Sequence, residues 1–155
     1  MKKKLKLAVL ALGAVFLLLQ LTNPSRTNPP VKRDMITAAN PPAAVAASLR
    51  AACYDCHSYE TKWPIYSRIA PSSWLVVKDV NEGRQHLDLS DWPEDTTRAA
   101  KKLDRINEVM DYREMPPQKY TMLHPEARLT EEQRKQVMEW TEAAAQKMRD
   151  GATNQ

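Results

Sequence analysis

Glycine, phenylalanine and cysteine are all scarce in this sequence. It has three glycines among 155 residues, and only Gly83 and Gly151 lie beyond residue 44. Runs of β-branched residues are few and no segment alternates apolar with polar positions, so the signals of a β-sheet are missing. The single phenylalanine, Phe16, lies in an N-terminal apolar run, which leaves the rest of the chain poor in core aromatics. These absences predict an all-α domain whose small helices are stabilised more easily around a large apolar cofactor than alone.

The two cysteines stand three residues apart, at Cys53 and Cys56, and His57 follows them directly. Such a motif can bind zinc, carry out thiol–disulfide exchange or attach a haem covalently. A structural zinc site needs four ligands, and a second closely spaced ligand pair is missing because His86 and His124 stand alone. A reactive Cys-x-x-Cys normally begins a helix after a strand, whereas this one is expected to end a helix. A structural disulfide remains an alternative in an exported protein.

Covalent haem fits the motif best. Two thiols at this spacing can add to the two vinyl groups on one porphyrin edge, and the imidazole of the next residue then reaches the iron. We therefore expect one haem c per chain, attached covalently to Cys53 and Cys56, with His57 as the proximal iron ligand.

The N-terminus has the layout of an export signal. Four lysines lie within residues 2–6, and an apolar run extends from Leu7 to Leu19. No small-residue cleavage pattern follows, and the stretch from Leu5 to Leu21 approaches the ~20 residues that cross a bilayer. Residues 1–21 are expected to be an uncleaved membrane anchor, with a removed signal peptide as the alternative. The lysines predict that the domain lies on the periplasmic side of a bacterial inner membrane.

The basic isoelectric point of about 9.1 comes from this end of the chain. Seven of the 23 Lys and Arg residues lie in residues 1–33, and from residue 35 onward 16 basic residues face 18 acidic ones. A nearly neutral exported domain gives no reason to expect a nucleic-acid partner.

Residues 22–44, rich in proline and asparagine, are predicted to tether this anchor to a haem-binding domain at 45–149. The domain's first helix is expected to begin with Asn40 as its N-cap and to continue through the Cys-x-x-Cys-His motif. Further helices are predicted over about 73–87 and 95–110, and a last one from Thr130, capped with Gln133. The residues expected on the apolar faces are Val45, Leu49, Cys53, Cys56, Trp74, Val77, Val80, Leu87, Ala99, Leu103, Ile106, Met110, Val137, Trp140, Ala144 and Met148.

Met115 is the best candidate for the sixth iron ligand. It precedes Pro116 and Pro117 in a segment whose prolines make a long helix implausible, so a stiff loop can present its thioether to the open haem face. Met122 and His124 in the same segment are fallbacks. His86 is expected to be an exposed helix histidine, with iron ligation as an alternative.

The second ring nitrogen of His57 is expected to donate to a backbone carbonyl, which we place near Pro71. The haem propionates need donors, and the pool comprises Trp63, Tyr66, Arg68, Trp74 and Tyr120.

The sequence resembles the small bacterial haem-binding domain family, which is related to class I c-type cytochromes. The general features are a helix ending in Cys-x-x-Cys-His, a Met-Pro loop and a closing amphipathic helix. The narrower ones are "TKWP", "IAPSSW" and "MPP…Y…LHPEA", and the resemblance covers about residues 45–148. It implies a cytochrome c-like helical fold around one covalent haem, ligated by His57 and Met115.

These features predict an electron carrier rather than a catalyst. With both His and Met as ligands, the iron would have no open position for a substrate, and its reduction potential would rise. The alternative is a haem sensor or peroxidase-like protein whose sixth ligand exchanges. A redox partner protein is expected, and no sequence feature identifies it.

Overall fold

The domain is built from helices alone. A computed structural model describes residues 1–153, and within this range the chain forms no strand, only an isolated bridge between Arg33 and Asp91. The longer helices are α1 (Lys2–Leu19), α3 (Ala43–Ala52), α5 (Ser72–His86), α6 (Thr96–Asp111) and α8 (Glu131–Thr153). Short α-helical turns form α2 (Met35–Ala39), α4 (Tyr54–His57) and α7 (Gln118–Thr121), and 3₁₀ turns form η1 (Gln20–Thr22), η2 (Ile65–Arg68) and η3 (Pro125–Ala127). The all-α prediction is confirmed.

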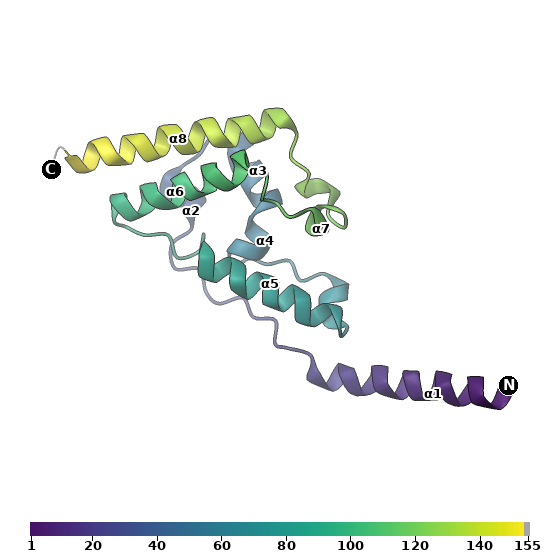
Figure 1. Cartoon of the computed structure of the whole chain (residues 1–155). Helices are drawn as coiled ribbons and strands as arrows, with labels where there is room; N and C mark the ends of the chain where they lie inside the picture. Colours follow the sequence, from purple (N-terminus) through teal and green to yellow (C-terminus); the bar gives the residue numbers. More distant parts are fainter. Residues whose placement is uncertain (154–155) are drawn as a thin grey trace.

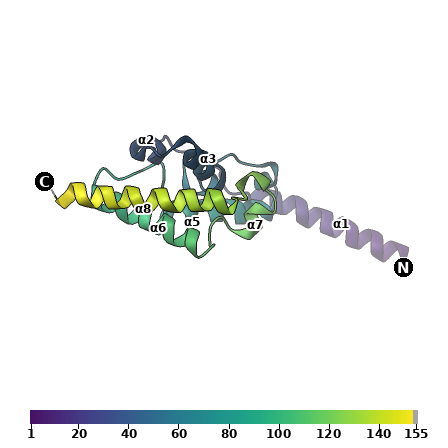
Figure 2. The same cartoon turned by 90° about the horizontal axis from the view of Figure 1, so that it is seen from above.

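Helices α6 and α8 form the most extensive helix pair and run side by side in opposite directions (Figures 1 and 2). Each begins at a side-chain cap. Asp95 accepts a hydrogen bond from the backbone N–H of Arg98 at 2.7 Å. Thr130 and Gln133 form the predicted capping box, with reciprocal side chain to backbone hydrogen bonds of 2.9 and 3.2 Å. Caps of this kind stabilise a helix by about 1 kcal/mol.

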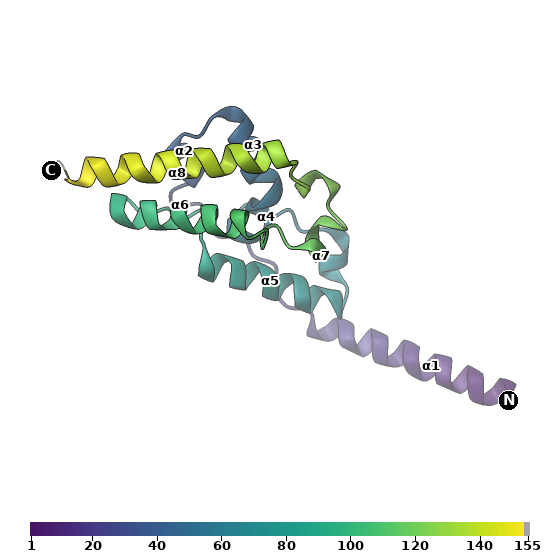
Figure 3. The ribbon, with the colours of Figure 1, turned by 45° about the horizontal axis from the view of Figure 1, so that its top comes forward.

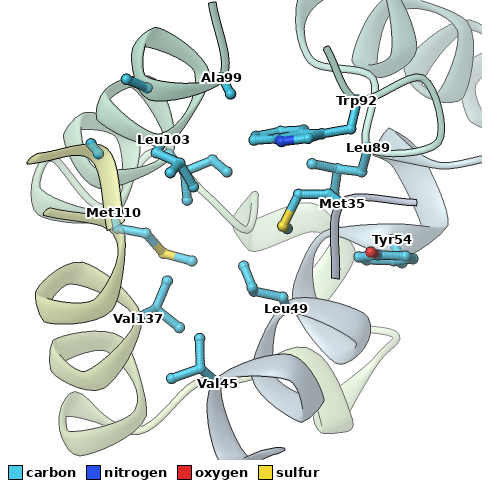
Figure 4. Close-up of a cluster of buried hydrophobic side chains, with 13 residues drawn as sticks. Met35, Val45, Leu49, Tyr54, Leu89, Trp92, Ala99, Leu103, Met110 and Val137 are labelled. Carbon is cyan, nitrogen blue, oxygen red and sulfur yellow. The ribbon is translucent and has the colours of Figure 1, made fainter. Parts of the chain in front are cut away.

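The hydrophobic core lies where α6 and α8 meet α3 (Figure 4). Leu103 and Met110 of α6, Val137 of α8 and Leu49 of α3 are fully buried there. Burial of a side chain of this size stabilises the fold by about 1.5–3 kcal/mol. The core fixes α3 against the α6–α8 pair, and therefore fixes the position of the cysteine motif that follows α3.

The first predicted helix is wrong in its start and in its continuity. Asn40 does not cap α3, because it ends α2 in the left-handed conformation with φ of 48°. Helix α3 begins after Pro42 and ends at Ala52, because Cys53, with φ of −122°, leaves the helical conformation. The motif therefore spans a bend, with Cys53 at the bend and both Cys56 and His57 in α4.

The proline-rich segment 22–44 lies along the domain instead of extending from it as a spacer. The backbone N–H groups of Lys32 and Arg33 donate to Ser90 O, each at 3.0 Å, and that of Met35 donates to Leu89 O at 2.8 Å. Met35 is fully buried in the core, where its side chain points toward Leu49 (Figure 4). Burial of Met35 and these backbone hydrogen bonds thus hold the segment on the domain, although its composition is typical of a flexible linker.

Helix α1 extends away from the domain, at the opposite end from the C-terminus (Figure 1). With η1 it forms a stretch of 21 residues, mean hydropathy 2.1, that is long and apolar enough to cross a membrane and has no buried residue. A signal sequence has the same properties, so the helix agrees with either expectation for residues 1–21.

Most side chains expected on the apolar faces lie inward. Ala99, Leu103, Ile106 and Met110 are buried along α6, and Val77 and Val80 along α5. Trp74 is the exception, with 38% of its surface exposed. Its indole N–H donates to Thr22 O at 3.2 Å, so it faces the end of η1 rather than the core.

Candidate functional site

A largely apolar cavity of about 610 Å³ lies beside the cysteine motif. Its walls are α4, α5, the C-terminal half of α6 and the segment from Glu114 to His124. The volume falls within the 300–1,000 Å³ typical of pockets for cofactors and small ligands. Cys53, Cys56, His57 and Met115 all line this one cavity, so the structure brings together the four residues that the sequence singled out.

His57 is held by two backbone carbonyl groups of the facing segment. Its Nδ1 atom lies 2.8 Å from Gly83 O and 3.0 Å from Leu87 O, so Nδ1 carries the proton and donates it to them. The other ring nitrogen, Nε2, then keeps its lone pair for a metal. Burial lowers the pKa of His57, which keeps the ring neutral near pH 7. The predicted backbone acceptor is present, but its predicted place near Pro71 is wrong.

Gly83 allows α5 to approach α4 this closely. A Cβ atom built at Gly83 would lie 2.6 Å from Cys56 O and 3.2 Å from its carbonyl carbon. Those are backbone atoms and cannot rotate away, so any larger residue would push α5 outward. The sequence showed that glycine is scarce, but without this contact nothing marked Gly83 as part of the site.

Cys53 and Cys56 are free thiols on the cavity wall. Burial is the main cause that raises the pKa of Cys53 to about 12 and that of Cys56 to about 11. Thiols used for disulfide exchange have a lowered pKa, because the thiolate is the nucleophile. The pair therefore lacks the electrostatics of a thiol–disulfide catalyst. Within residues 1–153, no group of three or more His, Cys, Asp or Glu side chains has the arrangement of a metal site.

Met115 lies in the segment after α6, which lines the cavity together with α4 and α5. Arg134 of α8 fastens this segment, since its Nη1 donates to Met110 O at 2.9 Å and to Met115 O at 3.1 Å. The backbone N–H of Met115 donates to Val109 O at 3.3 Å. The Met115 backbone is thus bonded from both sides, by α6 and α8, which limits where its side chain can go. No pattern in the sequence indicated that Arg134 takes part in the site.

The other three candidate ligands differ in their contacts and in their position relative to the cavity. Both ring nitrogens of His124 have partners, Nε2 with Tyr66 Oη at 2.6 Å and Nδ1 with Glu126 Oε1 at 3.0 Å. His86 is exposed in the last turn of α5 at the cavity rim, as expected. Met122 is 68% exposed and does not line the cavity.

The predicted propionate donors divide into two groups. Tyr66 and Tyr120 line the cavity, whereas Trp63, Arg68 and Trp74 do not. The Tyr120 hydroxyl donates to Asp55 Oδ2 at 2.8 Å. Burial and this hydrogen bond both raise the pKa of Tyr120. Trp63 Nε1 is buried without a hydrogen-bond partner among residues 1–153. An unpaired buried N–H is costly, so the atom needs an acceptor that the described residues do not supply.

A neutral histidine, two cysteines and a methionine around one apolar cavity are the features of a haem-binding helical domain. The chain belongs to the Haem-binding domain family, which matches residues 14–143 and thus most of its length. The match begins inside α1 and includes the proline-rich segment, in agreement with the packing of that segment on the domain.

Among curated proteins, the chain is similar to the cytochrome c peroxidase Ccp of Escherichia coli (strain K12). The two are 29% identical over 97 residues, which cover 57% of this chain and 20% of that protein. The chain therefore spans about a fifth of the length of this relative. No solved structure matches the chain.

Proposed function

We propose that this protein is a single-haem c-type electron carrier, held at the outer face of a bacterial inner membrane by α1. The observation that carries the proposal is the state of His57. Its Nδ1–H is bonded to Gly83 O and Leu87 O, and its Nε2 is left free in a cavity that also contains both cysteines.

The residues fit a covalently bound haem. Each thiol, Cys53 and Cys56, would add across one vinyl double bond, so that an S–C bond forms and the thiol hydrogen passes to the other vinyl carbon. The two thioethers would fix the porphyrin edge to the bend between α3 and α4. His57 Nε2 would hold the iron from one side. The haem itself would supply a one-electron iron couple.

Met115 would close the opposite side of the iron. Thioether ligation raises the reduction potential relative to a second imidazole and excludes external ligands. The hydrogen bonds from Arg134 and to Val109 hold the Met115 backbone in place. Trp63 Nε1, the buried donor without a partner, lies next to the cavity, since the chain neighbours of Trp63 on both sides line it.

A second function, haem-based peroxide or small-ligand chemistry, is favoured by the similarity to cytochrome c peroxidase Ccp. It requires a sixth position that opens to an external ligand. Met115 is the residue that decides between the two functions.

The test is to express the full chain with a haem-maturation system and to record absorption spectra in both oxidation states, with and without carbon monoxide. An electron carrier closed by Met115 gives a six-coordinate spectrum that carbon monoxide leaves unchanged. Ready binding of carbon monoxide by the unsubstituted chain would support the ligand-binding function instead. A chain without haem would exclude both.

A further inference from the structure

Large apolar side chains are exposed where η2 meets the first turn of α5. They are Ile65, Ile69, Trp74 and Leu75, and Ile65 and Leu75 are 73% and 63% exposed. Turn η2 packs directly against α5, so the four belong to one corner of the domain. Clustered exposed apolar residues on a small domain mark a surface that contacts a partner or a membrane. We refer to residues 65–75 as the apolar corner.

The apolar corner is hydrogen-bonded to the end of the membrane-length helix. Gln20 Oε1 accepts from the backbone N–H of Ala70 at 2.9 Å, and Gln20 Nε2 donates to Ala70 O at 3.3 Å. One turn further, Trp74 Nε1 donates to Thr22 O at 3.2 Å. These bonds place the corner directly at the point where α1 ends and the domain begins (Figure 3).

Basic residues predominate in the stretch that forms the corner. Residues 61–78 contain Lys62, Arg68 and Lys78 and no acidic residue, although Asp79 follows directly and Lys78 pairs with Glu82 at 3.7 Å. Residues 20–33, which lead from α1, contain only basic charges. Basic side chains next to a membrane-spanning helix are attracted to anionic lipid headgroups. Apolar side chains beside basic residues, at the end of a membrane-length helix, match the interface of a lipid bilayer.

We propose that the apolar corner rests in the interface of the bilayer that α1 spans, so that the domain sits directly on anionic lipid. The proposal depends on the membrane anchoring that forms part of the proposed function. Trp74, bonded to the last residue of the apolar stretch, lies at the depth of the headgroups, where tryptophan is enriched in membrane proteins. Arg68, in the same corner, faces the headgroup phosphates.

The arrangement also orients the haem cavity. Ser72 and Leu75, in the first turn of α5, belong both to the corner and to the cavity wall. The α5 side of the cavity therefore lies beside the membrane surface, and electron exchange at that edge takes place close to the lipid.

Photo-crosslinking to lipid tests the proposal on the full haem-loaded chain. The crosslinking amino acid p-benzoylphenylalanine is placed at Ile65 or Ile69, whose side chains are exposed and do not line the haem cavity. A position inside α1, Leu17, is the positive control. Tyr112, which is 68% exposed beyond the end of α6, is the matched control for exposure. Each variant is reconstituted in nanodiscs of phosphatidylethanolamine and phosphatidylglycerol, irradiated, and analysed for lipid adducts by mass spectrometry.

We expect lipid adducts at position 17 and at positions 65 and 69, and none at 112. Adducts at 17 without adducts at 65 and 69 would show an anchored domain held away from the lipid, which would overturn this inference and leave the anchoring intact. Adducts at 112 as well would show that the corner has no special contact, and would also overturn it. Absence of adducts at every position would overturn the anchoring and the inference together.

Discussion

The Nδ1 atom of His57 lies 2.8 Å from the carbonyl oxygen of Gly83, one turn before the end of α5. Gly83 is also where a Cβ atom would lie only 2.6 Å from Cys56 O. One residue thus sets the spacing between α4 and α5 and orients the histidine expected to hold the iron. The absence of a side chain at position 83 is therefore a requirement of the site.

Replacement of Gly83 by alanine tests this requirement. The added methyl group must displace a backbone carbonyl, and overpacking of this kind costs about 1–3 kcal/mol. We expect the free energy of unfolding, measured by denaturant titration, to fall by that amount. Gly151→Ala is the control, since nothing lies within 4 Å of a Cβ there. Equal stability of G83A and G151A would contradict the close approach of α5 to α4.

Replacement of Met115 by alanine tests the sixth ligand. Without the thioether the iron should become open on that side, so the reduced chain should bind carbon monoxide and its reduction potential should fall. Met122→Ala is the matched control, because Met122 lies in the same segment but outside the cavity. Unchanged spectra and potential in M115A would assign the distal position to another group.

Arg134 is expected to act as a positioning residue for Met115. Arg134→Gln removes a charged donor from Met110 O and Met115 O, and hydrogen bonds of charged groups contribute about 1.5–3 kcal/mol. We expect a fraction of the R134Q chains to bind carbon monoxide, which a loss of stability alone would not produce. Arg134→Lys should lower that fraction again, because it restores a charged donor. Lys135→Gln, next along α8 and in an exposed pair with Glu139, should leave both properties unchanged.

Acid should destabilise the fold through His57. Burial lowers the pKa of His57 below its usual 6.5, so below that pH the unfolded chain binds a proton that the folded chain does not. The stabilisation is complete above pH 6.5 and is lost as the pH falls through the folded-state pKa, with a slope of at most about 1.4 kcal/mol per pH unit. Iron binding by His57 should weaken in acid for the same reason, because the ligand must be neutral imidazole. Urea titrations between pH 7.5 and 5 measure this slope, and a flat profile would show that His57 is not buried in its neutral form.

The parts of the fold that follow from local sequence were predictable. The Thr130–Gln133 capping box and the apolar face of α6 depend on residues three or four positions apart, and both are confirmed. The start of α3 was wrong because Asn40, Pro41 and Pro42 support either a helix start or a helix end. The position of Met35 in the core decides between them, and that contact is distant in sequence.

The site was predictable in its residue types and not in its supports. The spacing of Cys53, Cys56 and His57 gave the chemistry, and the prolines after Met115 indicated a loop. The acceptors for His57 are backbone carbonyl groups, which every residue possesses, so only the packing of α5 on α4 identifies Gly83 and Leu87. The role of Arg134 and the attachment of residues 22–44 to the domain depend on contacts between distant residues in the same way.

Covalent attachment of haem at Cys53 and Cys56 is the central claim, and intact-mass spectrometry of the denatured chain tests it most directly. The full chain, expressed with a haem-maturation system, should carry the mass of one haem after unfolding and acid–organic extraction. Tryptic peptides should place both thioethers on the segment that contains the two cysteines. The single variants Cys53→Ala and Cys56→Ala should each keep at most one thioether, and the double variant should lose the haem on extraction. A full chain that has the mass of the polypeptide alone would contradict the account.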